Sequence, residues 1–254
     1  MHPHPDVKYI LSPQGVPIYF QGPDITSGPL PAVFYFALSG IATLYEDPFN
    51  QIINELSKEK IRIFSWDLPF HQEGSDPKQA MQQWSLELMQ NQNFISDFTD
   101  QCKSHLDFLI DQKIVNENKI ALAGLSRGGF IATHWCANDK RIKSLLGLAP
   151  LTKPQPLDDF PQAHIHSYKQ IQLVHLVQNL LHANVRFYIG NCDKRVGTEA
   201  CFEFINALSN TAYENGIKSP HVEMIIFPSI GHQGHGTPPH IFHAGAHWLT
   251  SQLL

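Results

Sequence analysis

Residues 120–135 read IALAGLSRGGFIATHW. An apolar, strand-like run leads into the pattern Gly-x-Ser-x-Gly with Ser126 at its centre, and helix-like sequence follows at once. In this strand–turn–helix context the pattern predicts a nucleophile elbow. A serine in so tight a turn takes unfavourable backbone angles, so Gly124 and Gly128 leave room that side chains would fill. The alternative interpretation is an ordinary glycine-rich turn with an incidental serine.

Short apolar runs alternate with helix-like segments on both sides of this stretch. We expect strands over residues 7–11, 16–21, 32–38, 61–66, 119–123, 143–151, 185–190 and 222–227, and helices from Asp47 and over 76–93, 94–110, 198–215 and 239–254. The first two strands flank a turn-forming Ser-Pro-Gln-Gly sequence and predict an antiparallel hairpin. The alternation after them predicts an α/β fold with a mostly parallel central sheet and helices on both faces.

The length of the chain, 254 residues, suits one large α/β domain over residues 1–254. Two stretches, about 70–93 and 152–182, interrupt the alternation and are expected to form small cap or rim segments. The rim residues Trp84 and Tyr168 are candidates to line a pocket or simply to pack.

Composition and charge argue against several classes of partner. The net charge is −5 and no basic run occurs, so nucleic acid is not an expected partner. No apolar stretch reaches the length of a membrane span, and the N-terminus has no basic segment followed by an apolar one. The cysteines form no Cys-x-x-Cys pattern and are expected to be buried, reduced thiols in a cytoplasmic protein. Oligomeric state stays open.

A serine nucleophile needs a base within hydrogen-bond reach and an acid that orients the base. In parallel sheets such groups lie just past the carboxyl ends of strands. Asp193 directly follows the expected strand 185–190 and is the favoured acid. Asp67 also ends a strand but precedes the serine, and we interpret it as structural or rim-lining; Asp158 and Asp159 lie in the proline-rich rim.

Two histidines compete for the role of base. The last strand is followed by the sequence PSIGHQGHG at residues 228–236, which contains His232 and His235. We favour His232, because it comes first after the strand and stands behind a glycine that gives the ring room. His235 is the alternative, and for each histidine the structural interpretation is a loop residue bonded to backbone.

These residues resemble a known group of enzymes. The elbow Gly-Leu-Ser-Arg-Gly-Gly, the acid segment Gly-Asn-Cys-Asp-Lys-Arg-Val and the base segment Phe-Pro-Ser-Ile-Gly-His are similar to those of the α/β-hydrolase fold, near dienelactone hydrolases and the catalytic domain of prolyl oligopeptidases. The chain order Ser, Asp, His is that of the class. The resemblance implies Ser126 as nucleophile, Asp193 as orienting acid and His232 as general base.

The same resemblance implies an oxyanion hole made of two backbone amides. The loop that usually begins His-Gly reads Ser39-Gly40-Ile41 here, so the amide matching the family donor is that of Ile41. The second amide is that of Arg127, the residue after the nucleophile. The chain departs from dienelactone hydrolases in having serine rather than cysteine at the elbow, and it encodes no propeller domain like that of prolyl oligopeptidases.

The expected reaction is hydrolysis of a small carboxylic ester through an acyl-enzyme, with no metal or organic cofactor. A short peptide or amide is the alternative substrate, and thioester cleavage or acyl transfer to an alcohol uses the same chemistry. A ligand-binding protein on a hydrolase scaffold is the non-enzymatic alternative.

A metal protein is a further alternative, because histidine is the commonest metal ligand. Histidines crowd the C-terminal part of the chain at His232, His235, His240, His243 and His247. The metalloprotease pattern His-Glu-x-x-His is absent, so surface histidines on the last helix are the favoured interpretation.

Overall fold

The central sheet is built from apolar runs whose alternate residues face opposite layers of helices. The computed structural model describes residues 7–90, 93–154 and 168–254. The strands are β1 (Tyr9–Leu11), β2 (Pro17–Gln21), β3 (Leu30–Phe36), β4 (Arg62–Ser65), β5 (Val115–Leu125), β6 (Ser144–Leu148), β7 (Asn184–Gly190) and β8 (Val222–Phe227). Their order in the sheet is β1-β2-β4-β3-β5-β6-β7-β8. This is the expected α/β architecture.

The direction of the strands also follows the expectation. β1 pairs antiparallel with β2, and β2 pairs antiparallel with β4. From β4 to β8 every pairing is parallel. The carboxyl ends of β5, β7 and β8 therefore meet at one edge of the sheet, which is where the elbow, the expected acid and the two histidines follow their strands.

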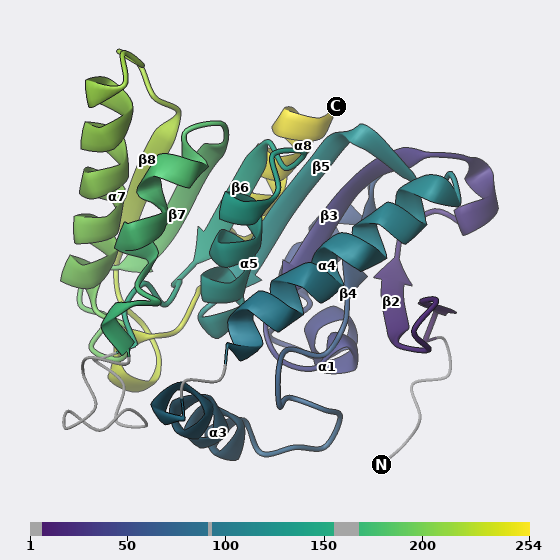
Figure 1. Ribbon diagram of the computed structural model, residues 1–254, viewed down its shortest axis with the longest axis horizontal. Coiled ribbons are helices and arrows are strands. Elements are labelled where there is room, and N and C mark those ends of the chain that lie inside the picture. Colours follow the sequence, from purple (N-terminus) through teal and green to yellow (C-terminus); the bar gives the residue numbers. More distant parts are fainter. Residues whose placement is uncertain (1–6, 91–92, 155–167) are drawn as a thin grey trace.

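Helices cover both faces of the sheet (Figure 1). The helices are α1 (Gly40–Tyr45), α2 (Gln51–Leu56), α3 (Pro77–Met89), α4 (Phe94–Asp111), α5 (Arg127–Asn138), α7 (Thr198–Glu214) and α8 (Pro239–Leu253), with 3-10 turns η1 (Ile25–Ser27), η3 (Leu173–Leu180) and η4 (His232–Gly234). Helices α4, α5 and α7 bury their apolar residues in one cluster, and α1, α2 and α8 bury theirs in another.

Strand β3 shows why the sheet separates two cores. Phe34 and Phe36 point to the α4–α5 side, while Val33 and Tyr35 point to the α2–α8 side, as the period of two in a strand requires. All four side chains are fully buried. A continuous apolar run is therefore the correct sequence signal for a strand covered on both faces.

Three elements differ from the sequence expectations. The helix expected from Asp47 begins at Gln51, with Asn50 as its N-cap, while the Asp47 carboxylate accepts a hydrogen bond from the Gln51 side chain. The short helix α1 was not expected, because its first residue is a glycine. In the rim, residues 155–167, which include Asp158 and Asp159, lie outside the described residues, and the later part of the stretch 152–182 forms the 3-10 turn η3.

All four cysteines are free thiols, and three of them are buried. Cys102, Cys136 and Cys201 are buried free thiols as expected, but Cys192 is exposed because it stands in the turn after β7.

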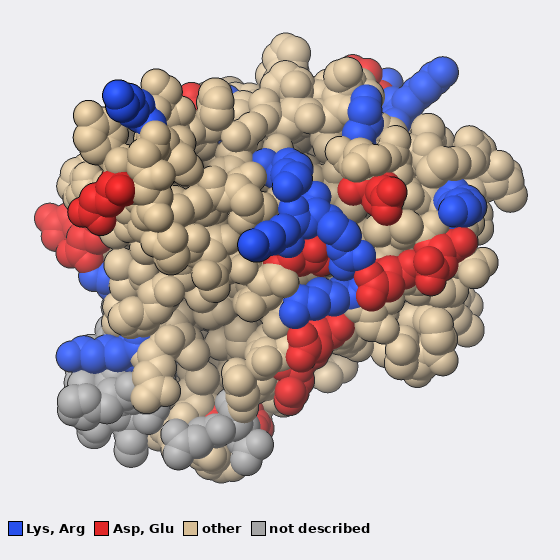
Figure 2. Space-filling view, turned by 45° about the horizontal axis from the view of Figure 1, so that its top comes forward, with Lys and Arg blue, Asp and Glu red and all other residues tan. Residues whose placement is uncertain are grey.

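Lys and Arg side chains lie beside Asp and Glu side chains on the face of the molecule that Figure 2 shows. Within the described ranges, no helix has both the length and the apolar character that crossing a membrane needs.

Candidate active site

Ser126 stands at the junction of β5 and α5 in a strained conformation. Its backbone angles are φ 54° and ψ −116°, in the region that side-chain-bearing residues rarely adopt. The turn is held by the Ser126 amide, which donates to the Leu148 carbonyl at 2.9 Å, and by the Ser126 carbonyl, which accepts from Leu151 at 3.0 Å. These bonds anchor the serine to the end of β6.

The two glycines of the motif are required by close backbone approaches. A Cβ atom on Gly124 would lie 2.3 Å from the Gly128 carbonyl carbon, and one on Gly128 would lie 1.9 Å from the carbonyl oxygen of Phe36. The steric reason inferred from the sequence therefore holds at both positions. Gly40 serves a different contact, because its Cβ would meet the ring of Tyr19 at 2.4 Å.

A continuous hydrogen-bond chain joins Ser126 to a histidine and a carboxylate. Nε2 of His235 lies 2.8 Å from Oγ of Ser126, and Nδ1 of His235 lies 2.7 Å from Oδ2 of Asp193. Because a carboxylate only accepts, the proton on His235 is at Nδ1 and leaves Nε2 as the acceptor for the serine hydroxyl. The arrangement has the geometry of a nucleophile, a base and an orienting acid.

The side chain of Asp193 is held by hydrogen bonds from backbone amides in its own turn. Its side chain is fully buried, and its Oδ1 accepts from the amides of Arg195 and Val196, each at 3.0 Å. These bonds leave Oδ2 directed at the imidazole. The acid expected from the sequence thus contacts a histidine, whereas Asp67 accepts from the Gly40 amide at 2.8 Å at the start of α1, in agreement with its structural interpretation.

The preference for His232 over His235 disagrees with this geometry. His232 begins the 3-10 turn η4 and is exposed. After it, Gln233 and Gly234 both have positive φ, and a β-bridge between Ile230 and Gly236 folds the loop back on itself. The loop therefore places His235, three residues after His232, next to Ser126.

The loops that carry the acid and the base are tied to each other. The Lys194 amide donates to the Gln233 carbonyl at 2.8 Å, and the Cys192 amide donates to Oγ of Ser229 at 2.7 Å. In return the Ser229 amide donates to Oδ1 of Asn191 at 3.0 Å. The positions of Asp193 and His235 are therefore fixed relative to one another.

A cavity of about 300 Å³ opens beside this chain of contacts. Its lining residues come from the ends of β3 and β5, the loop before α2, the start of α3, the elbow, the acid turn, the histidine loop and α8: Ala37, Leu38, Pro48, Phe49, Pro77, Leu125, Ser126, Arg127, Arg195, His235, Gly236, Thr237 and Phe242. Most of the wall is apolar. Trp84 and Tyr168 are not among these residues; both are buried, with the Trp84 indole donating to the Pro69 carbonyl and the Tyr168 hydroxyl 3.0 Å from Ser85 Oγ.

The two amides expected for an oxyanion hole differ in their placement. Arg127 is the first residue of α5 and lines the cavity next to Ser126, at a helix terminus that favours negative charge. Ile41 lies in the first turn of α1 and is not among the residues that line the cavity, so the role of its amide stays a prediction. Ala37 and Leu38 line the cavity, but the amides of both residues donate to Thr43 Oγ1.

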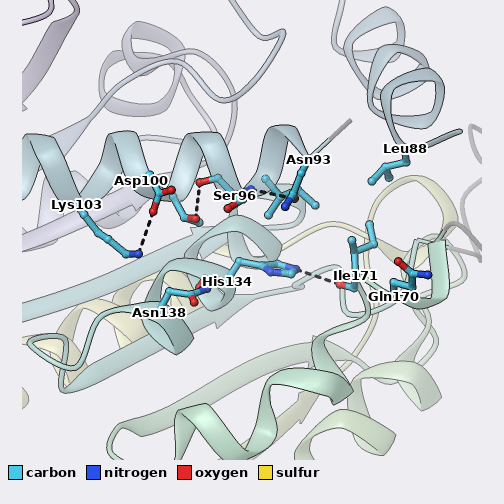
Figure 3. Close-up of a pocket in the computed structure, with 11 residues that line it drawn as sticks. Leu88, Asn93, Ser96, Asp100, Lys103, His134, Asn138, Gln170 and Ile171 are labelled. Atoms are coloured by element: carbon cyan, nitrogen blue, oxygen red, sulfur yellow. Dashed lines mark hydrogen bonds and ion pairs between the residues drawn. The ribbon is translucent and has the colours of Figure 1, made fainter. Parts of the chain in front are cut away.

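A larger cavity of about 440 Å³ lies elsewhere, between α4, α5 and residues 170–171 (Figure 3). The His134 ring contacts the Ile171 carbonyl at 3.0 Å, and Lys103 pairs with Asp100 at 3.0 Å. None of the residues of the Ser126 hydrogen-bond chain lines this cavity.

His243 and His247 on α8 lie apart from the hydrogen-bond chain of Ser126. His243 lies 3.2 Å from the carboxylate of Glu55, which α2 brings to it, and the His243 and His247 rings are 6.3 Å apart. Over residues 7–90, 93–154 and 168–254, no three histidine, cysteine or acidic side chains gather closely enough to hold a metal ion.

Comparisons with known proteins agree with this architecture. A sequence profile described as alpha/beta hydrolase fold matches residues 37–179. The structure is similar to TT1662 from Thermus thermophilus, with a TM-score of 0.71 and 13% identity over 98% of both chains. It is also similar to Est1E from Butyrivibrio proteoclasticus, with a TM-score of 0.63 and 13% identity over 97% of this chain and 98% of that one.

A similar fold also occurs inside longer proteins. Dipeptidyl peptidase 4 from Porphyromonas gingivalis is similar at a TM-score of 0.68 and 15% identity, over 98% of this chain but 35% of the peptidase. The present chain thus spans about a third of the length of that peptidase. A search among curated proteins gave no match.

Proposed function

The chain belongs to the alpha/beta hydrolase family, and from that membership we propose that it is a serine hydrolase in which Ser126, His235 and Asp193 form the catalytic triad. The observation that carries the proposal is the pair of short contacts at His235, 2.8 Å to the serine hydroxyl and 2.7 Å to the buried carboxylate. Both contacts lie beside a cavity that can admit a substrate.

The proposed reaction proceeds through a serine ester. His235 takes the Ser126 proton as the oxygen attacks a substrate carbonyl, and Asp193 stabilises the imidazolium. The oxyanion lies at the N-terminus of α5, where the Arg127 amide donates to it. His235 then protonates the leaving group, and a water molecule activated by the same nitrogen releases the acid and restores Ser126.

A small carboxylic ester is the proposed substrate. A cavity of about 300 Å³ suits a short acyl group, and its apolar wall suits an aliphatic chain. Cleavage of a short peptide or amide is the second candidate, favoured by the likeness in fold to a dipeptidyl peptidase. A thioester, or transfer of the acyl group to an alcohol, needs the same residues.

Labelling with a fluorophosphonate probe tests the nucleophile. The purified protein is expected to react at Ser126, as mapped by mass spectrometry, and Ser126→Ala is expected to lose both labelling and ester hydrolysis. Parallel assays with short-chain 4-nitrophenyl esters and aminoacyl 4-nitroanilides separate the two substrate classes. A folded protein that neither reacts with the probe nor cleaves any of these compounds would refute the proposal.

Two histidine variants test the base. His235→Ala is expected to lower kcat by at least about 10³-fold, because the serine then has no proton acceptor. His232→Ala provides the matched control, since it removes a histidine three residues away in the same loop, and it is expected to keep kcat within about threefold. The reverse pattern would assign the base to His232.

A further inference from the structure

The Thr198 side chain joins the two ends of the turn that carries Asp193. Thr198 is the first residue of α7, and its Oγ1 lies 2.6 Å from the carbonyl oxygen of Gly190, the last residue of β7. The Asp193 amide donates to the same Oγ1 at 3.0 Å. Because a carbonyl oxygen only accepts, the hydroxyl proton points to Gly190, and a lone pair of Oγ1 remains for the Asp193 amide.

This hydroxyl does not serve the helix in which it stands. A threonine at the start of a helix usually acts as its N-cap, with the side-chain oxygen accepting from an amide of the first turn. In α7 the N-cap residue is Gly197, and no side chain caps the helix. The Thr198 hydroxyl instead contacts backbone groups five and eight residues earlier in the chain. Helix capping therefore does not account for this residue.

Thr198 holds the backbone of Asp193 on both sides of its Cα atom. The Thr198 hydroxyl accepts from the Asp193 amide, and the Thr198 amide donates to the Asp193 carbonyl at 3.3 Å. The carboxylate is held by other groups, Oδ1 by two amides of the turn and Oδ2 by the ring of His235. The contacts of Thr198 thus fix the position of the acid, while the others fix the direction of its carboxylate.

The Asp193 amide depends on this hydroxyl because the residue is buried. Asp193 is 3% exposed, and its amide donates to Thr198 Oγ1. A buried amide is rarely left without an acceptor, so loss of the hydroxyl is expected to shift the turn until the amide finds another partner. Such a shift moves the carboxylate away from the imidazole of His235, which it now contacts at 2.7 Å.

We propose that Thr198 is a positioning residue of the catalytic triad, whose hydroxyl keeps Asp193 in place to orient His235. This inference rests on the proposed function, because a positioning role requires catalysis by these residues. The acid of a triad holds the imidazole in the tautomer and direction that accept the serine proton. A displaced acid slows this proton transfer, whereas substrate binding is unchanged, since Thr198 is not among the residues that line the cavity beside Ser126.

Removal of the hydroxyl tests the assignment in the ester assay. Thr198→Val keeps the branched shape and is expected to lower kcat by about tenfold or more while KM stays within about twofold. Thr198→Ser restores a hydroxyl and is expected to keep kcat within about threefold of the wild type. Thr99→Val is the matched control, because it removes a buried hydroxyl that donates to the Ser96 carbonyl at 2.9 Å in α4, and its kcat is expected to equal that of the wild type.

A double-mutant cycle shows whether Thr198 acts through Asp193. Asp193→Asn alone is expected to lower kcat by about 10³-fold or more, because an amide does not hold the required tautomer of the base. If Thr198 only positions the acid, adding Thr198→Val to this variant is expected to lower kcat by less than about twofold further. Equal losses in the two backgrounds would contradict a role through Asp193.

Two smaller side chains keep the test decisive if the valine variant does not fold. Thr198→Ala removes the hydroxyl without placing a methyl group against the Gly190 carbonyl, and it is expected to show the same loss of kcat at unchanged KM. Thr198→Ser retains the hydroxyl, so a folded serine variant as slow as the alanine variant would show that the hydroxyl is not what matters.

The outcomes separate this role from the function on which it rests. If the probe labels Ser126 and Thr198→Val hydrolyses esters as fast as Thr99→Val, the positioning role is refuted while the serine hydrolase stands. If the folded wild-type protein neither reacts with the fluorophosphonate nor cleaves any ester or anilide, both proposals fail. Loss of kcat in Thr198→Val, its recovery in Thr198→Ser and no further loss in the Asp193→Asn background would establish the role.

Discussion

At the residue scale, Gly128 is the position where the elbow has least freedom. An added Cβ would meet a backbone carbonyl oxygen at 1.9 Å, and a backbone atom cannot move aside as the end of a side chain can. Gly128→Ala is therefore expected to displace the elbow from the end of β3, lowering stability by about 2–3 kcal/mol or more and abolishing hydrolysis. Urea denaturation and the ester assay measure the two effects.

Gly216→Ala is the control for that substitution. Gly216 has φ +84° but no atom within 4 Å of the added Cβ, so the change introduces backbone strain without a clash. A cost of about 1 kcal/mol with unchanged activity is expected. Equal losses in the two variants would contradict the steric account of the elbow.

The histidines mark the limit of what residues alone could predict. The elbow and Asp193 each follow a strand directly, so the position of the strand end fixes where they lie. His232 and His235 stand in one nine-residue stretch, and choosing between them depends on the bridge from Ile230 to Gly236 and on the positive φ of Gln233. Such loop closure is a tertiary property that no local pattern in this sequence encodes.

At the element scale, Arg62 in β4 holds the chain segment that leads into β3. Its side chain is fully buried and donates to the carbonyls of Pro23 and Gly28 at 3.1 and 2.8 Å, and also to those of Asp24 and Ile114. Burial lowers the pKa of the guanidinium, although Asp24 partly opposes that shift. One charged residue thus donates to three carbonyls around η1 and to one just before β5.

Arg62→Met is expected to destabilise the protein by about 3–5 kcal/mol, since it removes the Arg62 donor from the Pro23 and Gly28 carbonyls and one of two donors from the Asp24 and Ile114 carbonyls. The midpoint of urea denaturation measures the loss. Arg62→Lys keeps the charge and part of the donor capacity, so a smaller loss is expected. If Met and Lys gave the same small loss, the carbonyl contacts would contribute little.

The elements also differ in how far the sequence reveals them. Strand β8 has the bounds expected from its apolar run, and α4 was evident from apolar residues repeating every four positions. Helix α1 has six residues and begins with Gly40, so neither its length nor its composition signals a helix. Its stability comes from the Ser39 side chain, which caps Ala42, and from Asp67, contacts that depend on the folded chain.

At the scale of the whole molecule, buried histidines couple stability to pH. Burial is the main cause that lowers the pKa of His71, His105 and His134 to about 4 each, against about 6.5 in the unfolded chain. Above pH 6.5 the rings are neutral in both states, and this part of the stability is complete. As the pH falls from 6.5 to 4 the unfolded chain binds protons that the folded chain does not, so stability declines.

We expect Tm to fall by several degrees between pH 7 and pH 5, measured by scanning calorimetry at constant ionic strength. His105→Phe removes one of the three groups, and neither ring nitrogen of His105 has a hydrogen-bond partner among the described residues. The variant should therefore show a shallower decline in Tm with acidification than the wild type. An identical slope would show that His105 does not contribute.

The hydrogen bonds between the loop after β7, which carries Asp193, and the loop after β8, which carries His235, also bear on where this chain can be divided. The exposed turn at residues 216–219 separates Asp193 from His235 in sequence, yet β8 pairs with β7, and α8 packs on α2. Two polypeptides, 1–216 and 217–254, would each carry part of the proposed catalytic machinery and be inert alone. Mixed together, they are expected to reassemble along β7 and recover hydrolysis, which makes this fold a candidate split reporter.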